Sequence, residues 1–362
     1  MRELRKDPVL NRWVIISSER AARPMDAFHV APENVDSYCP FCEGEESATP
    51  PEIYASRRPG ARPNGPGWSI RVVPNKYPAL SGASRQRANP TPELMVSSPA
   101  LAEVSPELAQ IGPVSDGVID IFHKMDGVGH HEVFIETPDH SQTLHTMDKS
   151  QAAVIFHTLK ARLLEIRKDP AMACAQFFKN HGRESGASLA HSHSQLIAMP
   201  VVSRTLGEEL AGAAHHRIKT GECVYCRILR REGDSGERLI AARDGIAALA
   251  PFASRFPYEM MIMPMGHSSG FEDSSAKIID ALASMLVDLL GALAQMFNNP
   301  PYNLVLHTAP FAPGHEEAYH WHLEIIPVMA RAAGFEWGSG FHINSVPPED
   351  AADRMRKALG NE

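Results

Sequence analysis

The segment "AHSHSQLIAMP", residues 190–200, places His191, His193 and Gln195 at alternate positions before an apolar run. Side chains at such positions share one face of a β-strand, so three polar groups would lie together. Imidazole can act as a nucleophile or a metal ligand, and an amide can donate to an anionic oxygen. Taken alone, the motif also fits a half-exposed strand with incidental histidines.

The neighbouring motifs favour metal binding. Four of the five cysteines form two C-x-x-C pairs, and the order Cys-x-x-Cys, His-Ser, His-x-His occurs twice along the chain, the second time ending in "YHWHLEIIPVM" at 319–329. Two cysteines and two histidines make a closed tetrahedral zinc site with no open position for substrate. The alternative is a reduced pair of core cysteines. We therefore predict two structural zinc sites, formed by Cys39, Cys42, His140 and His191 and by Cys223, Cys226, His267 and His320.

This assignment leaves His193 free for chemistry. With no acid partner nearby in the sequence, His193 suits nucleophilic attack on phosphorus. Gln195 can donate an N–H to a phosphoryl oxygen but cannot protonate a leaving group. The pair therefore favours a phosphate or sugar phosphate as the leaving group.

The two halves differ in this respect. Glu324 stands where the first half has Gln195, and an ionised carboxylate would repel an α-phosphate. We therefore expect only the first half to be catalytic, with His320 binding metal and His322 packing or hydrogen-bonding near the domain interface. Two further pairs of adjacent histidines, His130/His131 and His215/His216, have no regular spacing to the other motifs. We expect them at the surface or in loops.

The elements that must position these residues indicate an α+β fold. Apolar, β-rich runs such as 131–138, 194–200 and 322–329 alternate with two clear helical patterns, at 149–169 and 275–297. We predict two homologous domains, 1–205 and 206–362, divided near 201–215, each an antiparallel sheet with packed helices. The Pro-rich stretches 56–67 and 83–100 are expected to be loops.

Composition narrows the function. The net charge of −8 without a Lys/Arg cluster argues against nucleic acid as a partner. We identify no apolar stretch of about 20 residues and no secretory leader, so we expect a cytoplasmic protein without a membrane partner.

Several longer motifs carry a resemblance: "ELRKDPVLNRWVIISSERAARP", "VVPNKYPAL", "FFKNHGRESGASLAHSHSQ" and "GFEWGSGFHINSVPPEDAA". With them, the chain resembles the galactose-1-phosphate uridylyltransferase branch of the histidine-triad superfamily over nearly its whole length. The resemblance implies two histidine-triad-like domains, a homodimer with sites completed across the interface, and ping-pong transfer through a nucleotidyl-histidine. It also implies roles for individual residues: His193 as nucleophile, Gln195 and Ser188 on the phosphoryl group, Asn75 and Asn180 at the nucleotide, Arg20 and Arg23 near the phosphates, and Glu336 on sugar hydroxyls.

The departures from the family pattern bear on substrate and metal. Ser192 and Ser194 replace a Pro and a Gly, and the lysine and glutamine that handle the sugar phosphate have no match near Ala330 and His342. Some members hold iron in the second domain, so iron is the alternative metal there. These features are similar to the subgroup with ADP-glucose phosphorylase.

Three functions are therefore carried forward. The main one is UMP transfer between UDP-glucose and a hexose 1-phosphate, as in galactose metabolism. The second is AMP transfer between ADP-glucose and inorganic phosphate. The third is a zinc-stabilised nucleotide-binding protein without turnover.

Overall fold

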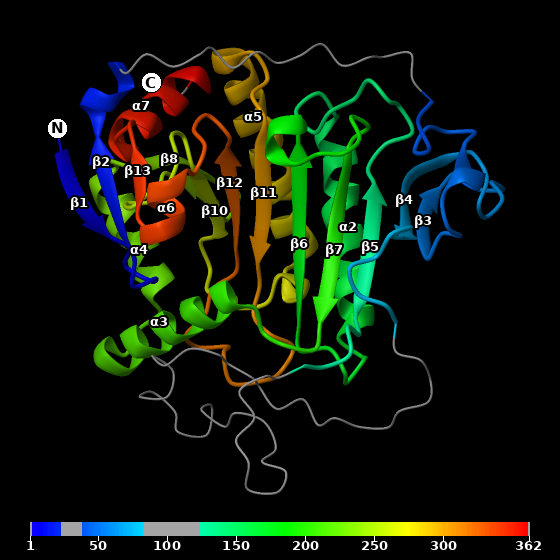
Figure 1. Cartoon of the computed structure of the whole chain (residues 1–362), viewed down its shortest axis with the longest axis horizontal. Helices are drawn as coiled ribbons and strands as arrows, with labels where there is room; N and C mark the ends of the chain where they lie inside the picture. The colour runs from blue at the N-terminus through cyan, green and yellow to red at the C-terminus, as the bar shows by residue number, and fades with distance from the viewer. Residues whose placement is uncertain (1, 23–37, 83–123, 361–362) are drawn as a thin grey trace, which may run out of the picture.

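The computed structural model describes residues 2–22, 38–82 and 124–360, and it has the α+β class expected from the sequence (Figure 1). The Pro-rich stretch 83–100, which was predicted to be a loop, lies outside these described residues. The strands are β1 (Arg2–Lys6), β2 (Trp13–Ser17), β3 (Tyr54–Arg57), β4 (Trp68–Pro74), β5 (His130–Ile135), β6 (Cys174–His181), β7 (His193–Met199), β8 (Leu239–Arg243), β9 (Ile246–Leu249), β10 (Met260–Pro264), β11 (Tyr302–His307), β12 (His322–Pro327) and β13 (His342–Asn344).

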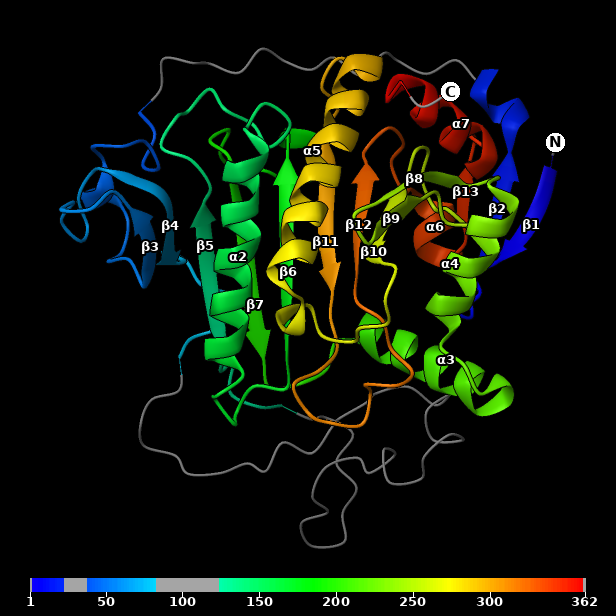
Figure 2. The same cartoon turned by 180° about the vertical axis from the view of Figure 1, so that it is seen from behind.

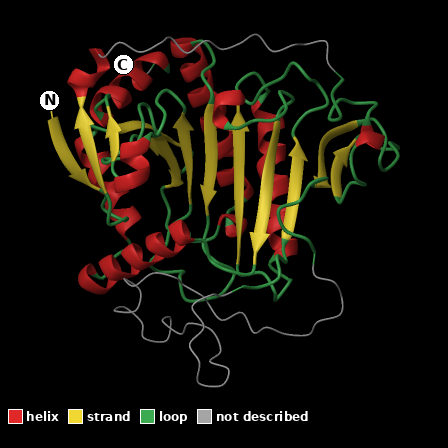
Figure 3. Ribbon diagram, in the orientation of Figure 1, coloured by secondary structure: helices red, strands yellow, loops and turns green. Residues whose placement is uncertain are grey.

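Ten of these strands form one sheet in the order β3-β4-β5-β7-β6-β11-β12-β10-β9-β8, and all its pairings are antiparallel. A smaller sheet, β1-β2-β13, lies at one end of the molecule (Figure 3). The helices are α2 (Lys149–Ile166), α3 (Arg204–Thr220), α4 (Val224–Ser235), α5 (Ala276–Phe297), α6 (Gly334–Ser339) and α7 (Pro348–Ala358). The two helices expected from the sequence, α2 and α5, are therefore confirmed within a few residues.

The core lies between this sheet and α2 and α5, which cover the same face side by side (Figure 2). Alternate residues of β6 and β7, such as Phe177, Leu196 and Ala198, point into this core and are buried. Burial of such apolar side chains is the main stabilising contribution to folding. On the opposite face, no helix or strand of the described residues covers β6 and β7 (Figure 1), and this face carries the polar residues of the His-x-His motif.

Helix α5 corrects one expectation. Its 22 residues are long and apolar enough to span a membrane by length and composition, contrary to the expectation that no such stretch exists. Most of this apolar stretch is buried inside the protein, as is typical of a helix that belongs to a hydrophobic core.

The two halves join through β6 and β11 into a continuous sheet. Phe178 pairs with Gln195 on one side and with Val305 on the other, and Val305 pairs with Glu324. Gln195 and Glu324 therefore occupy matching positions on either side of the β6–β11 junction. The sequence repeat predicted the matching halves, but not that their sheets would merge.

The division expected near 201–215 falls largely on α3, a regular helix whose N-cap Ser203 accepts a hydrogen bond from the Leu206 N–H. Helix α3 also carries His215 and His216, which lie at its partly exposed surface. The assignment of two domains, 1–205 and 206–362, stays a prediction.

Candidate active site and metal centres

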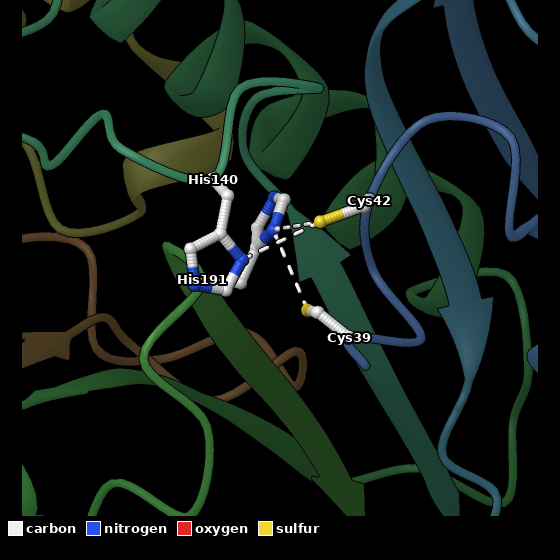
Figure 4. A group of neighbouring side chains, drawn as sticks. All are labelled: Cys39, Cys42, His140 and His191. Atoms are coloured by element: carbon white, nitrogen blue, oxygen red, sulfur yellow. Dashed lines mark hydrogen bonds between the residues drawn. The ribbon is translucent and has the colours of Figure 1, made fainter. Parts of the chain in front are cut away.

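The first Cys and His set converges as its spacing predicted (Figure 4). Cys39 and Cys42 lie on a short loop, His140 follows β5, and His191 lies two residues before the start of β7. The Cys42 sulfur lies 3.4 Å from His140 Nδ1 and 3.7 Å from His191 Nδ1, and the Cys39 sulfur also lies 3.7 Å from His191 Nδ1. All four ligand atoms lie within 4.8 Å of one another, so the set could hold one metal ion.

Hydrogen bonds orient this set for metal binding. The Nε2–H of His191 donates to the carbonyl oxygen of Thr137 at 2.7 Å, which leaves the Nδ1 lone pair directed at the sulfurs. Burial and the adjacent Cys39 raise the pKa of Cys42 to about 11. Ionising both thiols this close together requires a cation between them, and a metal ion at this set would supply it.

The second set repeats this geometry. Cys223 is the N-cap residue of α4, and the Cys226 sulfur lies 3.3 Å from His267 Nδ1 and 3.6 Å from His320 Nδ1. The Nε2–H of His320 donates to the carbonyl oxygen of Pro264 at 2.9 Å, as His191 does to Thr137 in the first half. These four ligand atoms also lie within 4.8 Å of one another. Both predicted ligand sets are thus brought together.

His193 is the first residue of β7 and is 7% exposed. Its Nδ1–H donates to the carbonyl oxygen of His191 at 2.8 Å, so Nε2 carries the free lone pair. Phe41, in the cysteine loop, packs edge-on against the ring with centroids 5.5 Å apart. Burial and the nearby Lys179 lower the pKa of His193, which favours neutral imidazole at pH 7. The geometry suits a nucleophile.

A buried ion pair lies beneath the motif and was not expected from the sequence. Lys179 of β6 donates to Glu136 at 2.7 Å, to the Ser192 hydroxyl at 3.0 Å and to the His193 carbonyl oxygen at 3.0 Å. The side chains of Lys179 and Glu136 are 2% and 1% exposed. Lys179 outweighs burial and lowers the pKa of Glu136, which keeps that carboxylate ionised. The pair ties β6 to the backbone of the motif from its core side.

Gln195 lies on the open face of the sheet, and two neighbouring side chains lie within hydrogen-bond distance of its side-chain oxygen. His131 Nε2 is 2.8 Å from the Gln195 side-chain oxygen, and Asn75 Nδ2 is 3.4 Å from that oxygen. The expectation that His131 is a surface or loop residue is wrong, because it lies on β5 and its half-buried ring reaches the site. His130 does face the surface, where its Nε2 lies 3.1 Å from Asp169.

Of the other predicted site residues, some lie near β7 and others lie far from it. Asn180 lies on β6 and accepts a hydrogen bond from Asn303 at 2.7 Å, and Ser188 is exposed in the loop before β7. Arg20 and Glu336, in contrast, lie in the short helix Ser18–Ala22 and in α6. Figure 1 shows α6 separated from β7 by the width of β6, β11 and β12. Arg23 lies outside the described residues.

Helix α3 packs against the second His-x-His motif and covers it. Glu209 of α3 accepts a hydrogen bond from the Tyr319 hydroxyl at 2.7 Å and lies 3.0 Å from His307 Nδ1. The His322 ring stacks on His307 with centroids 4.5 Å apart. The ligand atoms of Glu209, His307 and His322 lie within 4.8 Å of one another, close enough to hold a metal ion. Sequence spacing gave no signal for Glu209 or His307.

The charges of this buried cluster differ from those at His193. Burial opposes protonation of His307, but Glu209 and Glu324 outweigh it and raise the pKa of His307 to about 10. Burial and His307 lower the pKa of His322 to about 4. Arg255 donates to Glu324 at 2.7 Å and keeps that carboxylate ionised. The second motif therefore has its polar groups paired inside the protein, whereas the first faces open space.

The comparisons with known proteins identify the family of this chain. The family model described as "Galactose-1-phosphate uridyl transferase, N-terminal domain" matches residues 1–203, and a model for a domain of unknown function matches residues 124–362. The chain is 37% identical to the ADP-glucose phosphorylase of Arabidopsis thaliana, over 98% of this chain and 92% of that protein. It is 26% identical to the galactose-1-phosphate uridylyltransferase of Thermotoga maritima, over 99% of this chain and 98% of that protein.

Solved structures give the same result. A crystal structure of the Arabidopsis thaliana ADP-glucose phosphorylase with bound ADP-glucose aligns with a TM-score of 0.78 and 35% identity, covering 99% of this chain and 98% of that chain. A uridylyltransferase structure aligns with a TM-score of 0.71 and 27% identity, covering 99% of both chains. The expected resemblance is confirmed: the chain belongs to the galactose-1-phosphate uridyl transferase family of nucleotidyltransferases.

Proposed function

We propose that this protein transfers AMP between ADP-glucose and inorganic phosphate, the second of the functions weighed from the sequence. The observation that carries this proposal is the similarity to the Arabidopsis ADP-glucose phosphorylase, which reaches 37% identity, against 26% for the Thermotoga uridylyltransferase. The missing lysine and glutamine near Ala330 and His342 favour the same conclusion, because inorganic phosphate as acceptor needs no residues to hold a second sugar.

In this proposal His193 is the nucleophile. Its Nε2 forms a bond to the α-phosphorus of ADP-glucose, and the bond from that phosphorus to the bridging oxygen breaks. The bridging oxygen keeps the electron pair and leaves in glucose 1-phosphate, which needs no proton. An oxygen of inorganic phosphate then attacks the same phosphorus, ADP forms, and neutral His193 is regenerated.

The surrounding residues bind and orient. The Gln195 amide donates to a non-bridging α-phosphoryl oxygen, where negative charge must be stabilised during both transfers. Ser188 binds a phosphate oxygen from the exposed loop, and Asn75 and Asn180 line the nucleotide pocket. The Lys179 hydrogen bond to the His193 carbonyl oxygen fixes the backbone of the nucleophile.

We further propose zinc in both Cys and His sets. Two thiolates and two imidazole nitrogens are the donors that zinc prefers, and four protein ligands leave no position for substrate. The role is structural: each ion ties a cysteine segment to the strand that carries the His-x-His motif.

The deciding experiment is covalent labelling of the wild-type protein. ADP-glucose and UDP-glucose, each labelled with ³²P in the α-phosphate, are incubated with separate samples, and the denatured protein is counted. We expect label from ADP-glucose, released as ADP when inorganic phosphate is added.

The other outcomes discriminate among the remaining functions. Label from UDP-glucose, released by galactose 1-phosphate, would establish uridylyl transfer instead, which the Thermotoga relative favours. Binding of both nucleotide sugars without any covalent label would show a nucleotide-binding protein without turnover.

A further inference from the structure

His131 lies on the same face of the sheet as the His-x-His motif. In the β5–β7 pairing Val133 is opposite Gln195 and His131 is opposite Ile197, so His131 and Gln195 are diagonal neighbours on one face. The preceding residue, His130, points to the other side and meets Asp169. The His131 ring therefore lies beside the side chain that the proposed function assigns to the α-phosphoryl group.

The backbone fixes which nitrogen of His131 carries the proton. The N–H of Ala79 donates to His131 Nδ1 at 3.1 Å, and a backbone N–H can only donate. Nδ1 is therefore the acceptor nitrogen, and the proton of the neutral ring is on Nε2. An Nε2–H that lies 2.8 Å from the Gln195 side-chain oxygen donates to it.

Asn75 reinforces this arrangement. Its side-chain oxygen accepts a hydrogen bond from the N–H of Tyr77 at 2.8 Å, so its amide nitrogen faces the site. That nitrogen lies 3.1 Å from His131 Nε2 and 3.4 Å from the Gln195 oxygen. Because both nitrogens carry protons, the shared acceptor is the Gln195 oxygen.

Two donors on its oxygen leave the Gln195 amide one orientation. A flipped amide would set its NH₂ against two other donors, which is unfavourable. The NH₂ is instead directed away from His131 and Asn75 and is available to an anion.

We propose that His131 is a positioning residue that holds the NH₂ of Gln195 toward the α-phosphoryl oxygen of the nucleotide sugar. The inference rests on the proposed function, because it requires that Gln195 bind that oxygen. His131 itself touches no reacting atom and acts through Gln195. A donor fixed in place before the reaction stabilises the transition state more than one that must first reorient.

The test measures single-turnover labelling of the protein by α-³²P ADP-glucose. His131→Phe keeps a ring of similar size but has no donor, and His131→Gln keeps a side-chain N–H at similar reach. We expect the labelling rate to fall about 10- to 100-fold in His131→Phe, as for lost orienting partners elsewhere. We expect it to recover largely in His131→Gln. His130→Phe, on the other side of the same strand, is the matched control and should keep the wild-type rate.

A double-mutant comparison separates positioning from general damage. If His131 acts through Gln195, His131→Phe should have little further effect in a Gln195→Ala protein, whereas an independent role would multiply the two losses. The steady-state loss should fall on kcat with KM for ADP-glucose nearly unchanged. If His131→Phe does not fold, His131→Leu replaces it in both comparisons.

The outcomes distinguish the two proposals. Wild-type labelling with an unaffected His131→Phe variant, or with equal losses in both Gln195 backgrounds, would overturn the positioning role and leave the proposed function intact. Absence of wild-type labelling by ADP-glucose would overturn both.

Discussion

His193 and His322 hold matching places in the two halves but differ in what surrounds them. His193 has a free Nε2 on the open face, beside the neutral amide of Gln195. His322 is 1% exposed and stacks on His307, and Glu324 takes the place of the amide. Glu324 is paired with Arg255 and, as a carboxylate, has no N–H to donate to a phosphoryl oxygen. The proposed function therefore places the nucleotide at the first motif.

This contrast predicts the behaviour of two alanine variants. His193→Ala should lose covalent labelling by α-³²P ADP-glucose completely, because the nucleophile is gone. His322→Ala should keep the labelling, although removal of a buried ring should lower the melting temperature. A folded His193→Ala protein that still forms the adduct would contradict the assignment.

Among single residues, the sequence predicted the two converging Cys and His sets but missed His131, His307 and Glu209. The ligands were found because each set appears twice in the same order. His131 was missed because two adjacent histidines form no recognisable motif. Only their place in a strand, where successive side chains point to opposite faces, separates His131 from His130. Glu209 meets His307 only through the packing of α3, and no local pattern in the sequence records such packing.

At the scale of elements, the loop that carries Cys39 and Cys42 is linked to β7 through the first Cys and His set. Cys39 and Cys42 belong to a short irregular loop, and the ligand His191 is two residues from His193. A metal ion at this set would join the loop to the strand, next to Phe41, whose ring packs against His193. The order of the loop should therefore depend on the metal, as in other closed sites that couple binding to folding.

We expect Cys39→Ser to lose about one zinc per chain and to lower the melting temperature by roughly 5 °C or more. Metal content by mass spectrometry and thermal unfolding are measured on the same samples. Cys174→Ser is the control, since Cys174 is buried, hydrogen-bonds to the Val201 carbonyl oxygen and belongs to neither set. Wild-type protein that contains no metal and melts equally with and without chelator would contradict the structural role.

The strands themselves were largely predictable, whereas their order was not. Alternating apolar residues marked β5, β7 and β12 from local sequence alone. The β6–β11 pairing joins residues such as Phe178 and Val305, which are far apart in the chain. Such pairings depend on how whole layers pack, so periodicity cannot reveal them.

In the whole molecule, some of the residues that the family resemblance assigns to substrate lie far from the nucleophile. Arg20 and Glu336 lie in elements that pack over the second half, while His193 begins β7 in the first half (Figure 1). Phe335 and Trp337, which flank Glu336, are 48% and 80% exposed. Large exposed apolar side chains at one place favour contact with another chain.

These positions predict a homodimer in which α6 of one chain completes the site of the other. Alone, the His193→Ala protein should be inactive and the Glu336→Gln protein slow, but activity should return when their subunits are exchanged by mixing. A mixed dimer would unite an intact His193 and an intact Glu336 in one of its two sites. Equal mixing should then restore about a quarter of the wild-type rate, because half of the dimers are mixed and each has one intact site. A chain that sediments as a monomer, or variants that fail to complement after proven exchange, would mean that each chain builds its site alone.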